Sequence, residues 1–128
     1  MPNLRETRGV FLTLVVASLL MPAPAWSADE PISVGSKKFT ESVILGEIVV
    51  GLIESTGRKA THRSQLGGTR VAWKALKQGE IDLYPEYSGT IRQEIFPDQK
   101  LQGRDALRKA LAEKGIVMSE PLGFNNTY

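Results

Sequence analysis

Short apolar segments alternate with segments of helical period from residue 32 onward, and this alternation constrains the fold more than any other feature of the chain. Residues 32–36, 59–65 and 81–84 have the length and composition of β-strands. Between them, residues 42–55 and 71–78 repeat apolar side chains every three or four positions, which predicts helices. The alternation therefore predicts an α/β fold with a parallel-core sheet, flanking helices and right-handed crossovers.

The ends and faces of the predicted helices can be assigned from the sequence. Thr40 and Thr69 are expected to be the N-caps of the first two helices, and Gly57 and Gly79 are expected to end them. The first helix is expected to bury a broad apolar face, which consists of Ile44, Leu45, Ile48, Val49, Leu52 and Ile53.

The last third of the chain continues the same pattern less regularly. A third helix is expected to begin near Ser88 or Thr90, and residues 97–103 are expected to form a loop. A further helix is predicted over residues 104–114, followed by a fourth strand over residues 116–118.

The N-terminal segment has the pattern of a secretory signal peptide. Arg5 and Arg8 precede an uncharged run over residues 10–21, and small residues and helix breakers follow it. A spanning helix needs roughly 20 apolar residues, so the run is short for a membrane anchor. We expect residues 1–28 to be a signal peptide and residues 29–128 to be one folded unit. The mature chain is expected to begin between Trp26 and Asp29 and to be periplasmic or otherwise extracytoplasmic.

Composition excludes several classes of function. The chain has 16 basic and 14 acidic residues, and a net charge of +2 is too weak to indicate nucleic-acid binding. The absence of cysteine excludes disulfides, cysteine-based zinc sites and thiolate nucleophiles. The sole histidine, His62, is predicted to be a solvated side chain that lies beside no nucleophile. No hydrolase or metalloprotease motif is present, so we expect no enzyme, no metal site and no cofactor.

Loops at the carboxyl ends of the predicted strands are the expected position of a ligand site. These loops cover residues 36–40, 66–69 and 84–90 and carry aromatic rings, hydroxyls and carboxylates. Aromatic faces attract quaternary ammonium groups, and a carboxylate adds charge complementarity, so a small polar or cationic ligand is expected. Asp82 could contact such a ligand or pair with a neighbouring loop, and each of Tyr84 and Tyr87 could contact it or pack internally.

Several segments resemble the substrate-binding proteins of osmoprotectant ABC importers. They cover residues 34–41 (VGSKKFTE), 66–69 (LGGT), 79–90 (GEIDLYPEYSGT) and 121–128 (PLGFNNTY). The third segment is the most specific, and the order of the segments is that of the family. The family takes up glycine betaine, choline, carnitine and related compounds.

The resemblance implies a periplasmic binding protein-like fold of type II, with a ligand cleft between two lobes. The chain would be the N-terminal lobe, with the second lobe absent. It would be a solute-binding component, or a fragment of one, that captures a quaternary ammonium osmoprotectant and delivers it to a membrane permease. The alternative is a periplasmic ligand-sensing domain of a regulatory protein with the same fold. The ligand-binding residues that the resemblance implies are Lys38, Phe39, Thr40, Asp82, Tyr84, Glu86, Tyr87, Thr90, Asn126 and Tyr128.

Overall fold

The computed structural model describes residues 30–123 and residue 125, so the predicted signal peptide lies outside the described residues. The elements are β1 (Ile32–Gly35), α1 (Thr40–Ser55), β2 (Ala60–Arg63), α2 (Thr69–Lys77), α3 (Ser88–Thr90), the π-helical turn η1 (Ile91–Ile95) and α4 (Gly103–Ala112). None of the helices in the described part of the chain is both long and apolar enough to span a bilayer.

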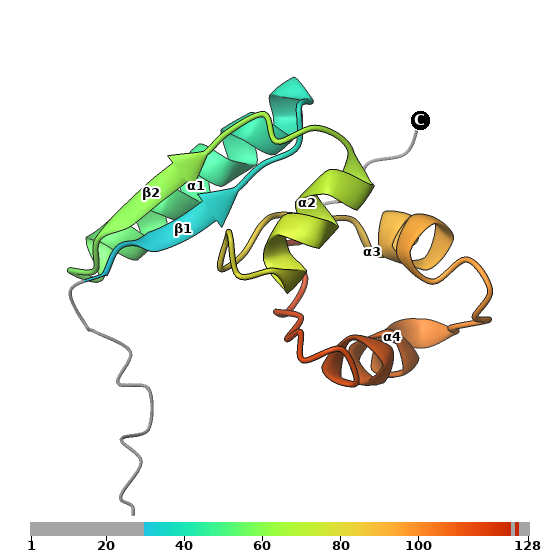
Figure 1. Cartoon of the computed structure of the whole chain (residues 1–128). Helices are drawn as coiled ribbons and strands as arrows, with labels where there is room; N and C mark the ends of the chain where they lie inside the picture. Colours follow the sequence, from blue (N-terminus) through green and yellow to red (C-terminus); the bar gives the residue numbers. More distant parts are fainter. Residues whose placement is uncertain (1–29, 124, 126–128) are drawn as a thin grey trace, which may run out of the picture.

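A parallel strand pair, β1 and β2, forms one end of the molecule, and α1 covers one face of it (Figure 1). The predicted α/β arrangement with a parallel sheet is therefore confirmed. The third predicted strand is wrong in extent, because it contributes a single parallel bridge between Leu83 and Val34. Pro85 follows closely, and proline has no N–H to continue a ladder and restricts the residue before it.

The two predicted N-caps are wrong by one residue. Phe39 and Gly68 occupy the cap positions, and Thr40 and Thr69 are the first residues of α1 and α2. Neither cap residue makes a side-chain bond to its helix. A later hydroxyl, that of Ser42, instead accepts a hydrogen bond of 2.8 Å from the backbone N–H of Lys37.

The predicted buried face of α1 is wrong in part, because Leu45, Val49 and Ile53 are partly buried and the other three predicted residues are exposed. Ile44, Ile48 and Leu52 are 54%, 53% and 62% exposed, whereas the buried residues of α1 are Ser42 and Gly46. Apolar residues occur on every side of this helix, so their spacing along the sequence does not identify which face is buried. The small residues decide the packing, because they let α1 approach the sheet closely.

The main apolar core lies among α2, η1 and α4 rather than beneath the sheet. The buried members are Ile91, Phe96, Leu107, Ala110 and Leu111, and the partly buried ones are Trp73, Ile95, Leu101, Ile116 and Met118. Residues 116–118 do not form the predicted fourth strand. Within the described residues the sheet consists of β1 and β2, and Ile116 and Met118 pack on the helical core instead.

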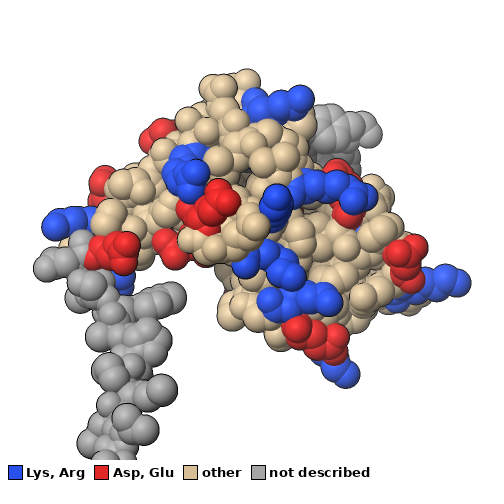
Figure 2. Space-filling view, viewed as in Figure 1, with Lys and Arg blue, Asp and Glu red and all other residues tan. Residues whose placement is uncertain are grey.

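The segment after α4 is tied back to that helix by ion pairs. Arg104 Nη1 lies 2.7 Å from Glu120 Oε2, and Arg108 also bonds the Glu120 carboxylate. The hydrogen bond from Arg108 and its positive charge lower the pKa of Glu120. Basic and acidic side chains are both spread over the face shown in Figure 2.

Candidate functional site

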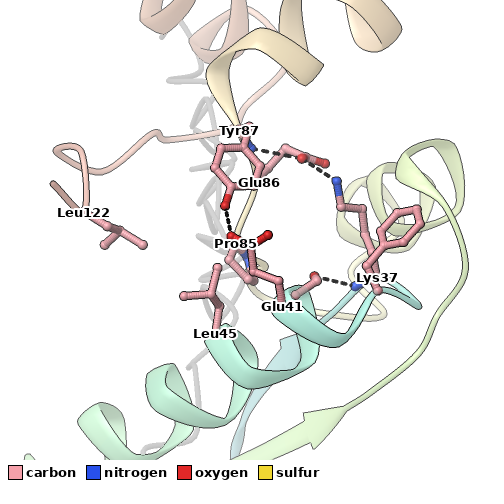
Figure 3. Close-up of a pocket in the computed structure, with 9 residues that line it drawn as sticks. Lys37, Glu41, Leu45, Pro85, Glu86, Tyr87 and Leu122 are labelled. Atoms are coloured by element: carbon pink, nitrogen blue, oxygen red, sulfur yellow. Dashed lines mark hydrogen bonds and ion pairs between the residues drawn. The ribbon is translucent and has the colours of Figure 1, made fainter. Parts of the chain in front are cut away.

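A pocket opens where the loop after β1, the first turns of α1 and the loop before α3 meet (Figure 3). Its cavity volume is about 60 Å³. Complete small-molecule sites have volumes of about 300–1,000 Å³, so the described residues form only a small part of a site of that size. Its lining residues are Lys37, Phe39, Glu41, Ser42, Leu45, Pro85, Glu86, Tyr87 and Leu122.

Backbone hydrogen bonds hold the three strand-end loops side by side. The Leu66 N–H donates to the Ser36 carbonyl at 2.9 Å, and the Lys38 N–H donates to the Gly67 carbonyl at 2.9 Å. The Gly35 N–H donates to the Leu83 carbonyl at 2.8 Å. Loop 66–69 is thus bonded to the loop after β1 but does not line the pocket, and residues of the other two loops do line it.

A buried ion pair forms part of the pocket wall. Lys37 Nζ lies 2.6 Å from Glu86 Oε1, and the two side chains are 9% and 5% exposed. The same carboxylate oxygen accepts the Tyr87 N–H at 2.9 Å. The Lys37 ammonium also lies 5.8 Å from the centre of the Phe39 ring. These contacts hold the first and third loops in one fixed arrangement.

Aromatic rings from two different loops border the pocket. The Phe39 side chain is 53% exposed, and Tyr87 is half-buried. The Tyr87 hydroxyl donates to the Glu41 carboxylate across the pocket, as the dashed line in Figure 3 shows. The lining therefore combines aromatic faces, carboxylates and apolar side chains, a combination that attracts soft organic cations.

The structure brings some of the predicted site residues together and leaves others apart. Phe39, Glu86 and Tyr87 line the pocket. The predicted residues that do not line it are Lys38, Thr40, Asp82, Tyr84 and Thr90. Asn126 and Tyr128 lie outside the described residues.

Asp82 and Tyr84 have structural surroundings of their own. The exposed Asp82 carboxylate accepts the backbone N–H of Ser33 at 2.7 Å, which ties the third segment to β1. Burial raises the pKa of the Tyr84 hydroxyl above its ordinary value, and the negative charges of Glu86 and Glu94 raise it further. Tyr84 is therefore a neutral phenol at physiological pH.

The structure adds lining residues that the sequence analysis did not assign to a site. They are Lys37, Glu41, Ser42, Leu45, Pro85 and Leu122. Helical spacing could have identified one pair, because Glu41 and Leu45 are four residues apart and share the pocket face of α1. Leu122 is distant in sequence, and no local pattern connects it with the pocket.

The prediction that His62 is a solvated side chain is wrong. Its side chain is 8% exposed and bonds both Glu47 and Ser36. Within residues 30–123 and residue 125, no three histidine or carboxylate side chains gather closely enough to hold a metal ion.

Comparisons with known proteins give consistent results. Residues 30–128 match the family described as the substrate binding domain of ABC-type glycine betaine transport systems. The chain is 33% identical to the glycine betaine-binding protein YehZ of Escherichia coli K12, over 100% of this chain and 43% of YehZ. It is 30% identical to the carnitine transport binding protein OpuCC of Listeria monocytogenes, over 91% of this chain and 40% of OpuCC.

A third relative has a different named solute. The chain is 35% identical to the ergothioneine transport permease/ergothioneine binding protein EgtU of Helicobacter pylori, over 93% of this chain and 22% of EgtU. Among solved structures, apo YehZ from Escherichia coli matches with a TM-score of 0.58 and 36% identity. That match covers 66% of this chain and 32% of YehZ. The predicted fold class, part of a lobe of the type II periplasmic binding fold, is confirmed. The chain spans less than half the length of each of these relatives.

Proposed function

The chain belongs to the family of substrate-binding domains of ABC-type glycine betaine transport systems, and from this we propose that it is a solute-binding component of such an importer. The proposal includes export by a signal peptide over residues 1–28 and an extracytoplasmic mature region over residues 29–128. The solute is a quaternary ammonium compound, and the partner that receives it is a membrane permease.

The composition of the pocket wall is the observation that carries this proposal. Glycine betaine, carnitine, choline and ergothioneine all contain a trimethylammonium group, which has a diffuse positive charge and no N–H donor. Aromatic faces stabilise such a group without hydrogen bonds. Phe39 and Tyr87 supply those faces, and the Glu41 carboxylate adds negative charge beside the internally paired Lys37 and Glu86.

The remaining predicted residues stay within the proposal as contacts that complete the site around the ligand. They are Lys38, Thr40, Asp82, Tyr84, Thr90, Asn126 and Tyr128. In a chain extended through a second lobe, replacing Tyr128 by alanine and by phenylalanine tests the predicted aromatic contact outside the described residues. The alanine variant is expected to weaken binding, and the phenylalanine variant to retain much of it, because the ring face remains.

Calorimetric titration of the full chain tests the proposal directly. The probes are choline, glycine betaine, carnitine and tetramethylammonium, with glycine as the control that lacks the methyl groups. Phe39→Ala is expected to weaken choline binding by about 0.5–2 kcal/mol, the value of one cation–π contact. Phe39→Tyr keeps the ring and is expected to bind nearly as the parent does.

The matched control is Val117→Ala, at a position that is 93% exposed and outside the pocket lining. This variant should bind all probes as the parent does. Binding of glycine as tight as that of choline would contradict the proposal. So would a Phe39→Ala chain with unchanged affinity for every quaternary ammonium probe.

A further inference from the structure

The part of the chain that follows α4 runs from the apolar core to the pocket. This connecting segment, residues 113–122, begins where α4 ends at Ala112, and its last residue is Leu122, which lines the pocket. In Figure 3, Leu122 and Lys37 lie at opposite sides of the pocket. The connecting segment therefore joins the two regions of the fold through its own backbone.

The first half of the connecting segment is anchored by a backbone hydrogen bond and by apolar packing. The Ile116 N–H donates to the Leu111 carbonyl at 3.0 Å. Ile116 and Met118 both pack against the buried cluster that contains Leu107. These contacts hold the chain on α4 as far as residue 118, but Leu122 lies four positions further on.

Two arginines of α4 hold the second half of the connecting segment. Arg104 Nη1 lies 2.7 Å from Glu120 Oε2, and Arg108 bonds the other oxygen of the same carboxylate. Arg108 Nη2 also lies 3.4 Å from the Ser119 carbonyl oxygen. Arg104 and Arg108 are four residues apart, so they share one face of the helix and both reach a single carboxylate.

Glu120 is the last residue of the connecting segment that a hydrogen bond or an ion pair holds. Within residues 30–123 and residue 125, no such bond holds Pro121 or Leu122. A proline ring fixes its own φ and restricts the residue before it, so Pro121 leaves little freedom between Glu120 and Leu122. The Cα atoms of Glu120 and Leu122 can be at most about 7 Å apart. The position of Glu120 therefore limits the position of Leu122.

We propose that Glu120 is a positioning residue that holds Leu122 at the pocket, and that losing its pairing with Arg104 and Arg108 weakens the binding of a quaternary ammonium solute. This inference rests on the proposed function of the pocket. Leu122 is 64% exposed, so packing alone holds it weakly in the absence of ligand. Without the Glu120 contacts, Leu122 would have to be ordered on binding, and such ordering costs free energy.

The expected effect on folding is small, which separates positioning from general support of the structure. Glu120 is 72% exposed and Arg104 is 50% exposed, and exposed ion pairs contribute little to stability. Glu120→Gln is therefore expected to leave the midpoint of urea denaturation nearly unchanged. A positioning role predicts that the same variant binds solute more weakly.

Nuclear magnetic resonance on the full chain tests the positioning without any ligand. Methyl relaxation measures the motion of the Leu122 side chain on the picosecond to nanosecond timescale. The Leu122 methyl groups are expected to be more mobile in Glu120→Gln than in the parent chain. Equal mobility in the two chains would overturn the positioning role.

Two further variants control for the loss of one negative charge. Glu113→Gln is the matched control, because Glu113 is exposed just after α4 and makes no ion pair with the described residues. It is expected to match the parent chain in Leu122 mobility and in choline binding. Glu120→Arg combined with Arg104→Glu and Arg108→Glu reverses the charges of the contact and is expected to restore both properties.

Calorimetric titration with choline completes the test. Glu120→Gln is expected to bind choline about two- to fivefold more weakly, the effect of losing exposed ion pairs of ordinary strength. Leu122→Ala is also expected to weaken binding. In the Leu122→Ala background, Glu120→Gln is expected to have no further effect, because residues that act through one another are not additive.

The outcomes separate this inference from the proposed function. Unchanged choline affinity in Glu120→Gln, or an undiminished effect of that change in the Leu122→Ala background, would overturn the positioning role. Greater Leu122 mobility in Glu120→Gln, with no choline binding by any chain, would contradict the proposed function and leave the positioning of Leu122 supported.

Discussion

At the scale of single residues, the contact between Lys37 and Glu86 connects segments 49 positions apart in the chain. Both side chains are buried, so each charge has exchanged water for the other. Such a pair adds little net stability relative to apolar residues, but removing one member leaves an uncompensated buried charge. The pair therefore specifies the geometry of the pocket wall more than it stabilises the fold.

Glu86→Gln is expected to lower the free energy of unfolding by about 3 kcal/mol, because Lys37 would remain buried without its counter-charge. Urea denaturation measures this change. The double variant Lys37→Met with Glu86→Leu is expected to recover most of the loss. Glu80→Gln removes the exposed partner of Arg63 and is expected to cost less than about 1 kcal/mol. Equal losses from the two glutamine variants would contradict this account.

Tyr84 makes stability depend on pH in the alkaline range. Its pKa is raised in the folded state above the ordinary 10.0, so folding favours the neutral phenol. This contribution is complete below the unfolded pKa and is lost as pH rises through the folded one. The parent chain is expected to lose more unfolding free energy than Tyr84→Phe as pH rises from about 9 to 11. Denaturation at a series of pH values checks this, and parallel losses would contradict it.

The sequence predicted the segments of the site better than the individual side chains. It placed Lys38 at the site, whereas the structure puts its neighbour Lys37 in the pocket wall. The two lysines are indistinguishable by composition, and only the direction in which β1 ends decides which one turns inward. Phe39, Glu86 and Tyr87 were predicted from the resemblance and do line the pocket.

At the scale of elements, α1 shows why sequence patterns can give the right helix and the wrong face. The predicted helix is present, and Gly57 follows it with a φ of +83°, as expected for a residue that ends a helix. The buried side, however, is selected by Gly46, which packs against His62. Which face of a uniformly apolar helix meets the sheet depends on shape, and a periodicity argument carries no information about shape.

The two glycines within α1 are a matched pair that tests this packing. Gly46→Ala is expected to destabilise the fold by about 1–3 kcal/mol, because the added methyl group meets the His62 ring. Gly51→Ala meets nothing within 4 Å and is expected to stabilise the fold by up to about 1 kcal/mol, the gain in helix propensity. Thermal or urea denaturation of both variants measures the difference. Equal effects would contradict the close approach of α1 to β2.

At the scale of the whole molecule, the apolar core and the pocket occupy different regions. The core lies among α2, η1 and α4, whereas the pocket lies at the ends of the strands, between α1 and the loop before α3 (Figure 1). The strand pair has α1 on one face, and the buried cluster surrounds α4. Resistance to local opening is therefore expected to differ between the two regions.

Hydrogen exchange can measure that difference. Amides of α4 are expected to exchange more slowly than those of β2, because α4 carries the fully buried Leu107. Leu107→Ala is expected to reduce protection throughout the chain, with a loss of about 2–5 kcal/mol in unfolding free energy. Val117→Ala, at an exposed position, serves as the control. Slower exchange in β2 than in α4 would contradict this assignment of the core.

The participation of Leu122 in the pocket has a consequence for the order in which the molecule assembles. β1, α1 and β2 are consecutive in the chain, so they can associate as soon as residue 63 is available. The pocket is lined by Leu122 as well as by residues of α1, and closing so long a loop is entropically slower than pairing adjacent segments. During synthesis, a nascent chain can therefore have its strand pair well before its pocket is complete. The pocket wall is complete only once residue 122 has been synthesised.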